Sequence, residues 1–333
     1  MKTTLLTKMG GILAASALAL TACGASNSGG EPAGDGGGES DAAAKDWAAC
    51  TPGDGSKDVA DLSDDEKDVS LGIFNGWDES YATIYLLKNV LEEDGYKVKT
   101  EELDAGPMFT GVAQGDIDFF TDGWLPLTHA SYIEQFGDDL VDHGCWYDNA
   151  KLTIAVNEDS PAKTIGDLKT MGDEYNNTLY GIEAGAGLTK TTKEEAIPEY
   201  GLDNLDYKIS STPAMLAQLK KSTDAGDNVA VTLWRPHWAY DAFPVRDLKD
   251  PKNAMGDAEK IYNFSGKDAA EQHPYVSQLL QNLVLNDEHL ASLENLMFSE
   301  DHYNGKDHEK AVAEWLKENP DFVDTWKSGE LAK

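Results

Sequence analysis

Short apolar runs alternate along the chain with stretches of helical periodicity. Three of these runs end at a tryptophan, and they read Leu71-Gly-Ile-Phe-Asn-Gly-Trp77, Ile117-Asp-Phe-Phe-Thr-Asp-Gly-Trp124 and Val229-Ala-Val-Thr-Leu-Trp234. Runs of this length and apolar character predict strands, and the helical patterns beside them favour a mostly parallel sheet. From about Ala269 the apolar residues recur every three to four positions, which predicts helices with one buried face. The pattern therefore predicts an α/β fold.

The three tryptophans at the strand ends predict a ligand site. In an open α/β sheet, ligands bind in the crevice beyond the carboxyl ends of the strands. Three indole faces that converge there suit a cation that cannot donate hydrogen bonds, above all a quaternary ammonium group. The alternative is that each is an ordinary buried tryptophan. Their occurrence at three equivalent strand ends, rather than in mid-strand, favours the ligand site.

The N-terminus predicts a secretory signal that ends at a lipidated cysteine. Lys2 and Lys8 precede an apolar stretch over 10–20, which leads into Leu20-Thr21-Ala22-Cys23. This ending resembles the lipobox of bacterial lipoproteins, and the resemblance implies a signal peptide over 1–22, diacylglycerol on Cys23 and anchoring to the outer face of the cell membrane. An ordinary secreted protein is the alternative. No later stretch approaches the roughly 18 unbroken apolar residues of a membrane span.

The composition changes sharply after Cys23. Residues 24–40 are almost entirely Gly, Ala, Ser, Asn, Asp and Glu, which predicts a flexible linker. We expect this linker to occupy 23–67, although Trp47 and Cys50 interrupt its polar character. The remaining chain is long enough for two lobes of ordinary domain size.

Two cysteines remain if Cys23 carries lipid. Outside the cytoplasm, Cys50 and Cys145 predict one disulfide, which would join the end of the linker to the first lobe. Two unpaired thiols are the alternative. Neither residue has the spacing of a zinc site, and the sequence predicts no bound metal.

The formal net charge of −33 argues against nucleic acid and against anionic lipid as partners of the protein body. Motifs of nucleophile elbows, zinc proteases and phosphate-binding loops are absent from the sequence, which predicts neither an enzyme nor a cofactor. With 60 Asp and Glu residues, any pairing of carboxylates for acid–base work would be arbitrary.

A glycine turn and one histidine predict an anion site. The turn runs from Gly181 to Lys190 and precedes a helical pattern, so its free backbone N–H groups favour a carboxylate or another anion. It lacks the third glycine of a dinucleotide-binding motif, and a tight turn without a ligand is the alternative. His129 lies just past Trp124 on a segment entering a helix, where a ring N–H could bind a carboxylate; a structural histidine is the alternative.

With these features together, the chain resembles the glycine betaine/choline-binding proteins of ABC transporters. The resemblance runs from about Val69 to the C-terminus. The matching segments are Gly76-Trp77-Asp78, Gly106-Pro-Met-Phe109, Gly115-Asp-Ile-Asp118, Trp124-Leu-Pro-Leu-Thr-His129, Trp146-Tyr-Asp-Asn-Ala-Lys151, Gly181 to Lys190 and Trp234-Arg-Pro-His-Trp238.

The resemblance implies a role for each matching residue. Trp77, Trp124 and Trp234 match the three tryptophans that enclose a trimethylammonium group. His129 and the backbone N–H groups of Gly187 and Leu188 match the donors to the ligand carboxylate.

The same resemblance bears on the choice between betaine and choline. In choline-binding members an acid and a tyrosine complete the cage. Glu79 stands in the position of the acid, whereas Leu152 stands in that of the tyrosine. The presence of His129 and the missing tyrosine favour betaine over choline.

The family also implies a two-lobed, periplasmic-binding-protein-like architecture of class II. Lobe 1 is predicted over 68–149 and 241–333 and lobe 2 over 150–240, with the ligand in the cleft and a hinge crossed near Asp148–Leu152 and near Trp238–Val245. Closure on the ligand would signal to a permease and its ATPase. A choline or proline betaine receptor, a sensor lipoprotein and an enzyme acting on a trimethylammonium compound remain as alternatives.

Overall fold

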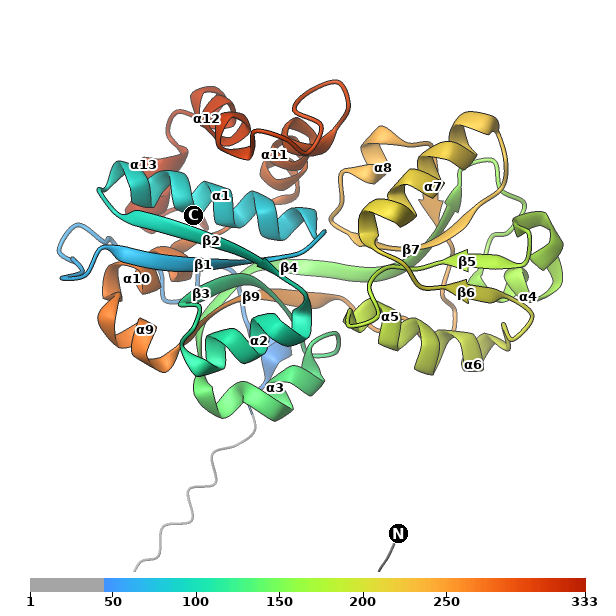
Figure 1. The fold of residues 1–333 in the computed structure, drawn as a ribbon, viewed down its shortest axis with the longest axis horizontal. Helices are drawn as coiled ribbons and strands as arrows, with labels where there is room; N and C mark the ends of the chain where they lie inside the picture. The colour runs from blue at the N-terminus through green and yellow to red at the C-terminus, as the bar shows by residue number, and fades with distance from the viewer. Residues whose placement is uncertain (1–44) are drawn as a thin grey trace, which may run out of the picture. The chain divides into compact units, whose positions relative to one another are not determined.

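Nine strands within residues 45–333 form a sheet that runs through both halves of the molecule (Figure 1). The computed structural model describes these residues. The strands are β1 (Asp68–Phe74), β2 (Lys97–Leu103), β3 (Phe119–Leu125), β4 (Leu140–Asn157), β5 (Thr178–Tyr180), β6 (Asp206–Lys208), β7 (Ala230–Arg235), β8 (Val245–Asp247) and β9 (Glu259–Gly266). Their spatial order is β2-β1-β3-β9-β4-β7-β5-β6, and β8 pairs with β4.

Helices cover both sides of this sheet (Figure 1). They are α1 (Asp78–Glu93), α2 (Ala105–Gln114), α3 (Ala130–Phe136), α4 (Leu168–Met171), α5 (Gly187–Thr191), α6 (Ile197–Tyr200), α7 (Thr212–Ala225), α8 (Ala239–Ala242), α9 (Lys267–Gln272), α10 (Pro274–Asn282), α11 (Asp287–Phe298), α12 (His308–Glu318) and α13 (Phe322–Lys327). In the first half, α1, α11 and α12 pack together over one side of the sheet, and α2 and α3 lie on the other. The core between them contains fully buried aromatic residues such as Phe74, Phe120 and Phe264. No helix of the described chain combines the length and the apolar content that crossing a membrane requires.

The long strand β4 divides the molecule into two lobes. Its first part, Leu140–Ala150, pairs with β9, and its second part, from Lys151 to Val156, pairs with β7. Lobe 1 therefore contains β2, β1, β3, β9 and the first part of β4, whereas lobe 2 contains the second part of β4 with β7, β5, β6 and β8. The chain first crosses from lobe 1 to lobe 2 at residues 150–151. There β4 continues without a break but changes its hydrogen-bonding partner from β9 to β7. This position lies inside the predicted range 148–152.

The second crossing lies later in the chain than the sequence predicts. Strand β8 still pairs with Ala155–Asn157 in lobe 2, and a bridge between Thr164 and Lys249 extends that attachment. The chain returns to lobe 1 only at β9, so lobe 2 continues past the predicted boundary at 240 to about residue 258. The three-residue length of β8 explains the difference, because so short a strand carries no apolar run by which a sequence pattern can detect it.

The sheet is mixed rather than mostly parallel. Strand β1 is parallel to β2 and β3, and β5 is parallel to β6 and β7. Strand β9, in contrast, is antiparallel to both of its neighbours, and β4 is antiparallel to β7 and β8. The two antiparallel strands at the centre are those in which the chain leaves lobe 1 and returns to it, and these two passages run in opposite directions.

Residues 45–67 pack against lobe 1 and do not form the linker that the sequence predicts for them. Val59 is buried, and its N–H donates to the carbonyl of Lys327 at 3.0 Å. The side chain of Asn282 pairs with both backbone groups of Lys57, at 3.0 and 2.8 Å. The signal peptide predicted over 1–22, the lipidation at Cys23 and the first part of the linker lie outside the described residues.

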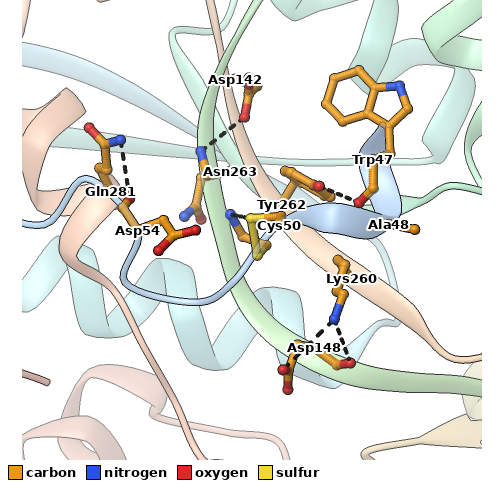
Figure 2. The surroundings of a disulfide bond; sticks show 12 residues. Trp47, Ala48, Cys50, Asp54, Asp142, Asp148, Lys260, Tyr262, Asn263 and Gln281 are labelled. Atoms are coloured by element: carbon orange, nitrogen blue, oxygen red, sulfur yellow. Dashed lines mark hydrogen bonds and ion pairs between the residues drawn. A yellow bond between two sulfur atoms is a disulfide. The ribbon is translucent and has the colours of Figure 1, made fainter. Parts of the chain in front are cut away.

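A disulfide joins Cys50 to Cys145 of β4 (Figure 2), which is the pairing favoured by the sequence. Beside it, Trp47 packs edge to face on Tyr262, and the Tyr262 hydroxyl donates to the Trp47 carbonyl. The bridge spans a sequence separation of 95 residues. In the chain-entropy model, closing a loop of that length stabilises the fold by about 4–5 kcal/mol.

Candidate ligand-binding site

A small cavity lies between the two lobes, and it is lined mostly by apolar and aromatic side chains, as pockets for small molecules are. All seven residues that the sequence singles out for ligand binding line it. The lining consists of Trp77, Glu79, Trp124, Thr128, His129, Leu152, Ile182, Ala186, Gly187, Leu188 and Trp234. Thr128, Ile182 and Ala186 were not predicted, although the first is the neighbour of His129 and the other two belong to the glycine turn.

Three indole rings reach this cavity from the ends of three strands. Trp77 follows β1 and is the N-cap residue of α1, after Gly76 turns the backbone with a φ of +82°. Trp124 and Trp234 are the penultimate residues of β3 and β7. All three side chains are at least nine-tenths buried. Trp77 and Trp124 come from lobe 1 and Trp234 from lobe 2, so the aromatic lining is complete only when the lobes are together.

Neighbouring groups fix the orientation of each indole. The Trp77 ring stacks on Phe74 at 4.8 Å between centroids. Trp124 Nε1 donates to Asp122 at 2.7 Å, and Trp234 Nε1 donates to Glu79 at 3.1 Å. Because the N–H edges of Trp124 and Trp234 are bonded to acids beside the cavity, the rings cannot rotate freely. When the lobes are together, the aromatic walls of the cavity are therefore held in fixed orientations, with their faces available to a cation.

His129 presents a neutral N–H group in the cavity. Its Nδ1 accepts the backbone N–H of Trp124 at 2.9 Å, so the proton of the neutral ring is on Nε2. Burial lowers the pKa of His129 to about 3, which keeps the ring uncharged at neutral pH. Nε2 is buried and has no hydrogen-bond partner within residues 45–333. An unpaired buried donor beside a cavity is a site for an acceptor on a ligand.

The glycine turn contributes backbone N–H groups from lobe 2. Gly187 and Leu188 are the first residues of α5, where backbone N–H groups have no partner within the helix. A Cβ atom on Gly187 would lie 2.2 Å from the carbonyl oxygen of Thr128, so only glycine fits where the two lobes meet. The turn therefore brings N–H donors of one lobe to the histidine of the other.

A small cavity enclosed by two α/β lobes, with binding groups contributed by each, defines a two-lobed binding protein of the periplasmic type. Residues 67–318 match the family described as the substrate binding domain of ABC-type glycine betaine transport systems, OpuAC, and the chain belongs to this family.

Solved structures with this fold include two liganded proteins. One is lactococcal OpuAC in its closed-liganded conformation with glycine betaine, with a TM-score of 0.71 and 29% identity over 78% of this chain and 99% of that chain. Another is an ABC-transporter choline binding protein with choline, with a TM-score of 0.71 and 26% identity over 79% of this chain and 92% of that one.

One relative of this chain is the glycine betaine/carnitine transport binding protein GbuC of Listeria monocytogenes. It is 37% identical over 163 residues, which are 48% of this chain and 52% of the relative. The match thus spans about half the length of that protein.

Proposed function

We propose that this protein binds glycine betaine, or a related quaternary ammonium osmolyte, in the cavity between its lobes and delivers it to the permease of an ABC importer. The proposal rests on one observation: the same cavity contains three buried indoles and the uncharged imidazole of His129, whose N–H has no partner in the described residues. The indoles suit the methylated nitrogen, and His129 with the N–H groups of Gly187 and Leu188 suits the carboxylate. A zwitterion satisfies both halves of such a site at once.

The lining favours a betaine over choline. Leu152 offers no hydroxyl where choline-binding members of the family are expected to have a tyrosine, and it lines the cavity. Burial, reinforced by repulsion from Asp122 and Glu294, raises the pKa of Glu79 well above its ordinary value, which favours the neutral form of this acid. A neutral Glu79 supplies no charge to balance the net positive charge of choline.

Calorimetric titration of the purified protein against glycine betaine, proline betaine, choline, carnitine, ectoine and proline tests the proposed function. We expect glycine betaine or a close analogue to bind most tightly and proline, which has no methylated nitrogen, to bind weakly. Tight binding of choline alone would support the choline receptor. No binding of any quaternary ammonium compound would overturn the proposal.

The proposal includes the setting in which the protein works. We propose that it acts outside the cytoplasm, held to the membrane by lipid on Cys23, and that a permease with its ATPase subunit receives the closed form. No catalytic step is part of this function. A sensor lipoprotein would use the same cavity but a signalling partner, and coupled uptake of betaine in a reconstituted membrane separates the two. Turnover of a candidate ester would instead reveal an enzyme.

Replacing His129 should separate betaine from choline. A hydrogen bond to a charged group contributes about 1.5–3 kcal/mol, so His129→Ala should weaken glycine betaine binding roughly ten- to a hundredfold. Any residual choline binding should be almost unchanged, because choline has no carboxylate. Parallel titrations of both ligands measure the difference.

Two amide variants show which ring nitrogen matters. Asparagine keeps an acceptor near the position of Nδ1 for the Trp124 N–H but does not reach the position of Nε2; glutamine reaches the position of Nε2. We expect His129→Asn to behave like alanine and His129→Gln to retain more affinity. Betaine affinity that survives in the alanine variant, or an equal loss for choline, would contradict the assigned role.

A further inference from the structure

Four acidic side chains are buried together in lobe 1, behind the tryptophan-lined cavity. Asp78 and Glu79 begin α1, Asp122 lies in β3, and Glu294 lies in α11. Their exposed fractions are 7%, 2%, 0% and 0%. We call these four residues the acidic cluster. Only one of them, Glu79, lines the ligand cavity.

A single segment of lobe 2, Trp234–Trp238, is hydrogen-bonded to three members of the acidic cluster. Trp234 Nε1 donates to Glu79 at 3.1 Å, and the backbone N–H of Trp238 donates to Glu294 at 3.1 Å. Trp238 Nε1 donates to Asp78. These three bonds join the two lobes, because the donors belong to lobe 2 and all three acceptors belong to lobe 1.

No fixed cation compensates the acidic cluster. Within residues 45–333 no Lys or Arg forms an ion pair with any of its members, and the nearest basic group is His237, whose Nε2 lies 3.6 Å from Asp78 Oδ2. His237 is itself neutral, since its Nδ1 accepts the N–H of Ala239 and burial lowers its pKa to about 3. In the same described region no group of three or more side chains is arranged to hold a metal ion. Four buried carboxylates without a counter-ion would be very costly, so protons must neutralise part of the cluster.

The pKa shifts of the four acids agree with their burial and with the absence of a counter-ion in the described part of the chain. Burial raises the pKa of Asp78 and of Asp122 to about 7. The pKa values of Glu79 and Glu294 are raised well above their ordinary range, first by burial and then by the charges of neighbouring acids, with Asp241 adding to the repulsion at Glu294. His129, the other titratable group of the cavity, stays neutral above about pH 3. Asp78 and Asp122 are therefore groups that titrate near neutral pH at this junction.

We propose that the acidic cluster is a proton-binding site shared between the lobes, so that closure on the ligand takes up protons. When the lobes separate, Asp78 and Glu294 lose their lobe 2 donors and return toward water, where their ordinary preference for the ionised form is restored. Closure buries them again and requires their protonation. The inference rests on the proposed function only in that glycine betaine serves as the closing ligand.

The sign of the pH dependence follows from proton uptake. Well below the pKa of the separated form, about 4, both forms hold their protons and pH has no influence. Between that value and the higher pKa of the closed form, closure must take up a proton, and the affinity for ligand falls up to about tenfold per pH unit for each proton. Affinity should therefore be highest at acidic pH and decline through neutral pH toward a plateau.

Calorimetry of glycine betaine binding tests the proton uptake directly. Titrations at about pH 5.5, about pH 7 and about pH 8.5 should show the dissociation constant rising with pH, and at neutral pH the binding heat should vary with the ionisation enthalpy of the buffer, in the direction of uptake. A dissociation constant that does not change with pH, together with a heat that is independent of buffer, would overturn the proton site and leave the proposed function standing.

Matched variants test which acidic residues take up the protons on closure. Asp78→Asn and Glu294→Gln fix the neutral form and should flatten the pH dependence while ligand still binds. Glu288→Gln changes an exposed acid on the same helix as Glu294 and should leave the pH dependence as in the wild type. If Glu288→Gln flattens it equally, or the other two variants leave it unchanged, the assignment to the cluster is wrong.

A measurement without ligand separates the two proposals. Scattering of the unliganded protein should give a smaller radius of gyration at about pH 5.5 than at about pH 8.5, and Asp78→Asn with Glu294→Gln should reduce that difference. If glycine betaine gives no binding heat at any pH, the proposed function fails. The scattering of the unliganded protein at the two pH values then tests the proton site without any ligand. Equal radii at both pH values would then overturn it.

Discussion

Replacement of Trp77, Trp124 or Trp234 with alanine should weaken glycine betaine binding about thirtyfold, because a desolvated cation–π contact contributes about 2 kcal/mol. Two such replacements in one chain should nearly abolish binding. The three rings come from different strands and both lobes, so no remaining ring can move into the space of a lost one. Calorimetric titration of the single and double variants gives the affinities.

Conservative variants and a distant tryptophan serve as controls. Replacement of a cage tryptophan by phenylalanine keeps an aromatic face and should cost much less than alanine. Trp234→Phe also removes the N–H bonded to Glu79, so any excess loss there, compared with Trp77→Phe, measures that bond between the lobes. Trp315→Phe, in a buried contact between α11 and α12, should leave affinity unchanged. Wild-type affinity in all three single alanine variants would exclude the cage.

Gly187→Ala should prevent productive closure and reduce affinity by more than about a hundredfold. The added Cβ would lie 2.2 Å from the Thr128 carbonyl oxygen and 2.8 Å from its carbonyl carbon, and backbone atoms cannot move aside as a flexible side chain can. Relieving the contact requires the lobes to separate by a fraction of an ångström or more, and overpacking of this kind costs about 3 kcal/mol. Titration measures the affinity, and scattering at saturating ligand should show a larger radius of gyration than in the wild type.

The control is Gly185→Ala in the same turn. A Cβ there would meet only the Tyr132 hydroxyl at 3.8 Å, which is an ordinary contact. We expect nearly unchanged affinity and closure. If Gly187→Ala binds like Gly185→Ala, then the lobes do not need the close approach between Gly187 and Thr128.

The residues that line the cavity could be predicted because their signals are local. A tryptophan at the end of an apolar run is visible in a few residues of sequence, and so is a glycine turn before a helix. The state of His129 was not visible, because its tautomer depends on the backbone N–H of Trp124, which is brought to its Nδ1 only by the folded turn.

Features that depend on distant segments could not be predicted. The acidic cluster combines α1, β3 and α11, and among 60 acidic residues no sequence pattern marks Asp78, Asp122 and Glu294 as neighbours. The end of lobe 2 could not be predicted for the same reason, because it depends on the pairing of β8 with the distant strand β4. Residues 45–67 read as a linker because their composition is polar, yet a few contacts such as Val59 suffice to hold them on lobe 1.

The Cys50–Cys145 bridge determines how the molecule bears a mechanical load. A pull transmitted along the chain from before Lys45 reaches lobe 1 through this covalent link, five residues before β4 changes its partner from β9 to β7. The force therefore enters lobe 1 before either crossing between the lobes, so lobe 2 does not lie on its path. A protein immobilised by its N-terminus should open and close as freely as one in solution, which makes that end a suitable point of attachment for a surface-bound sensor of its ligand.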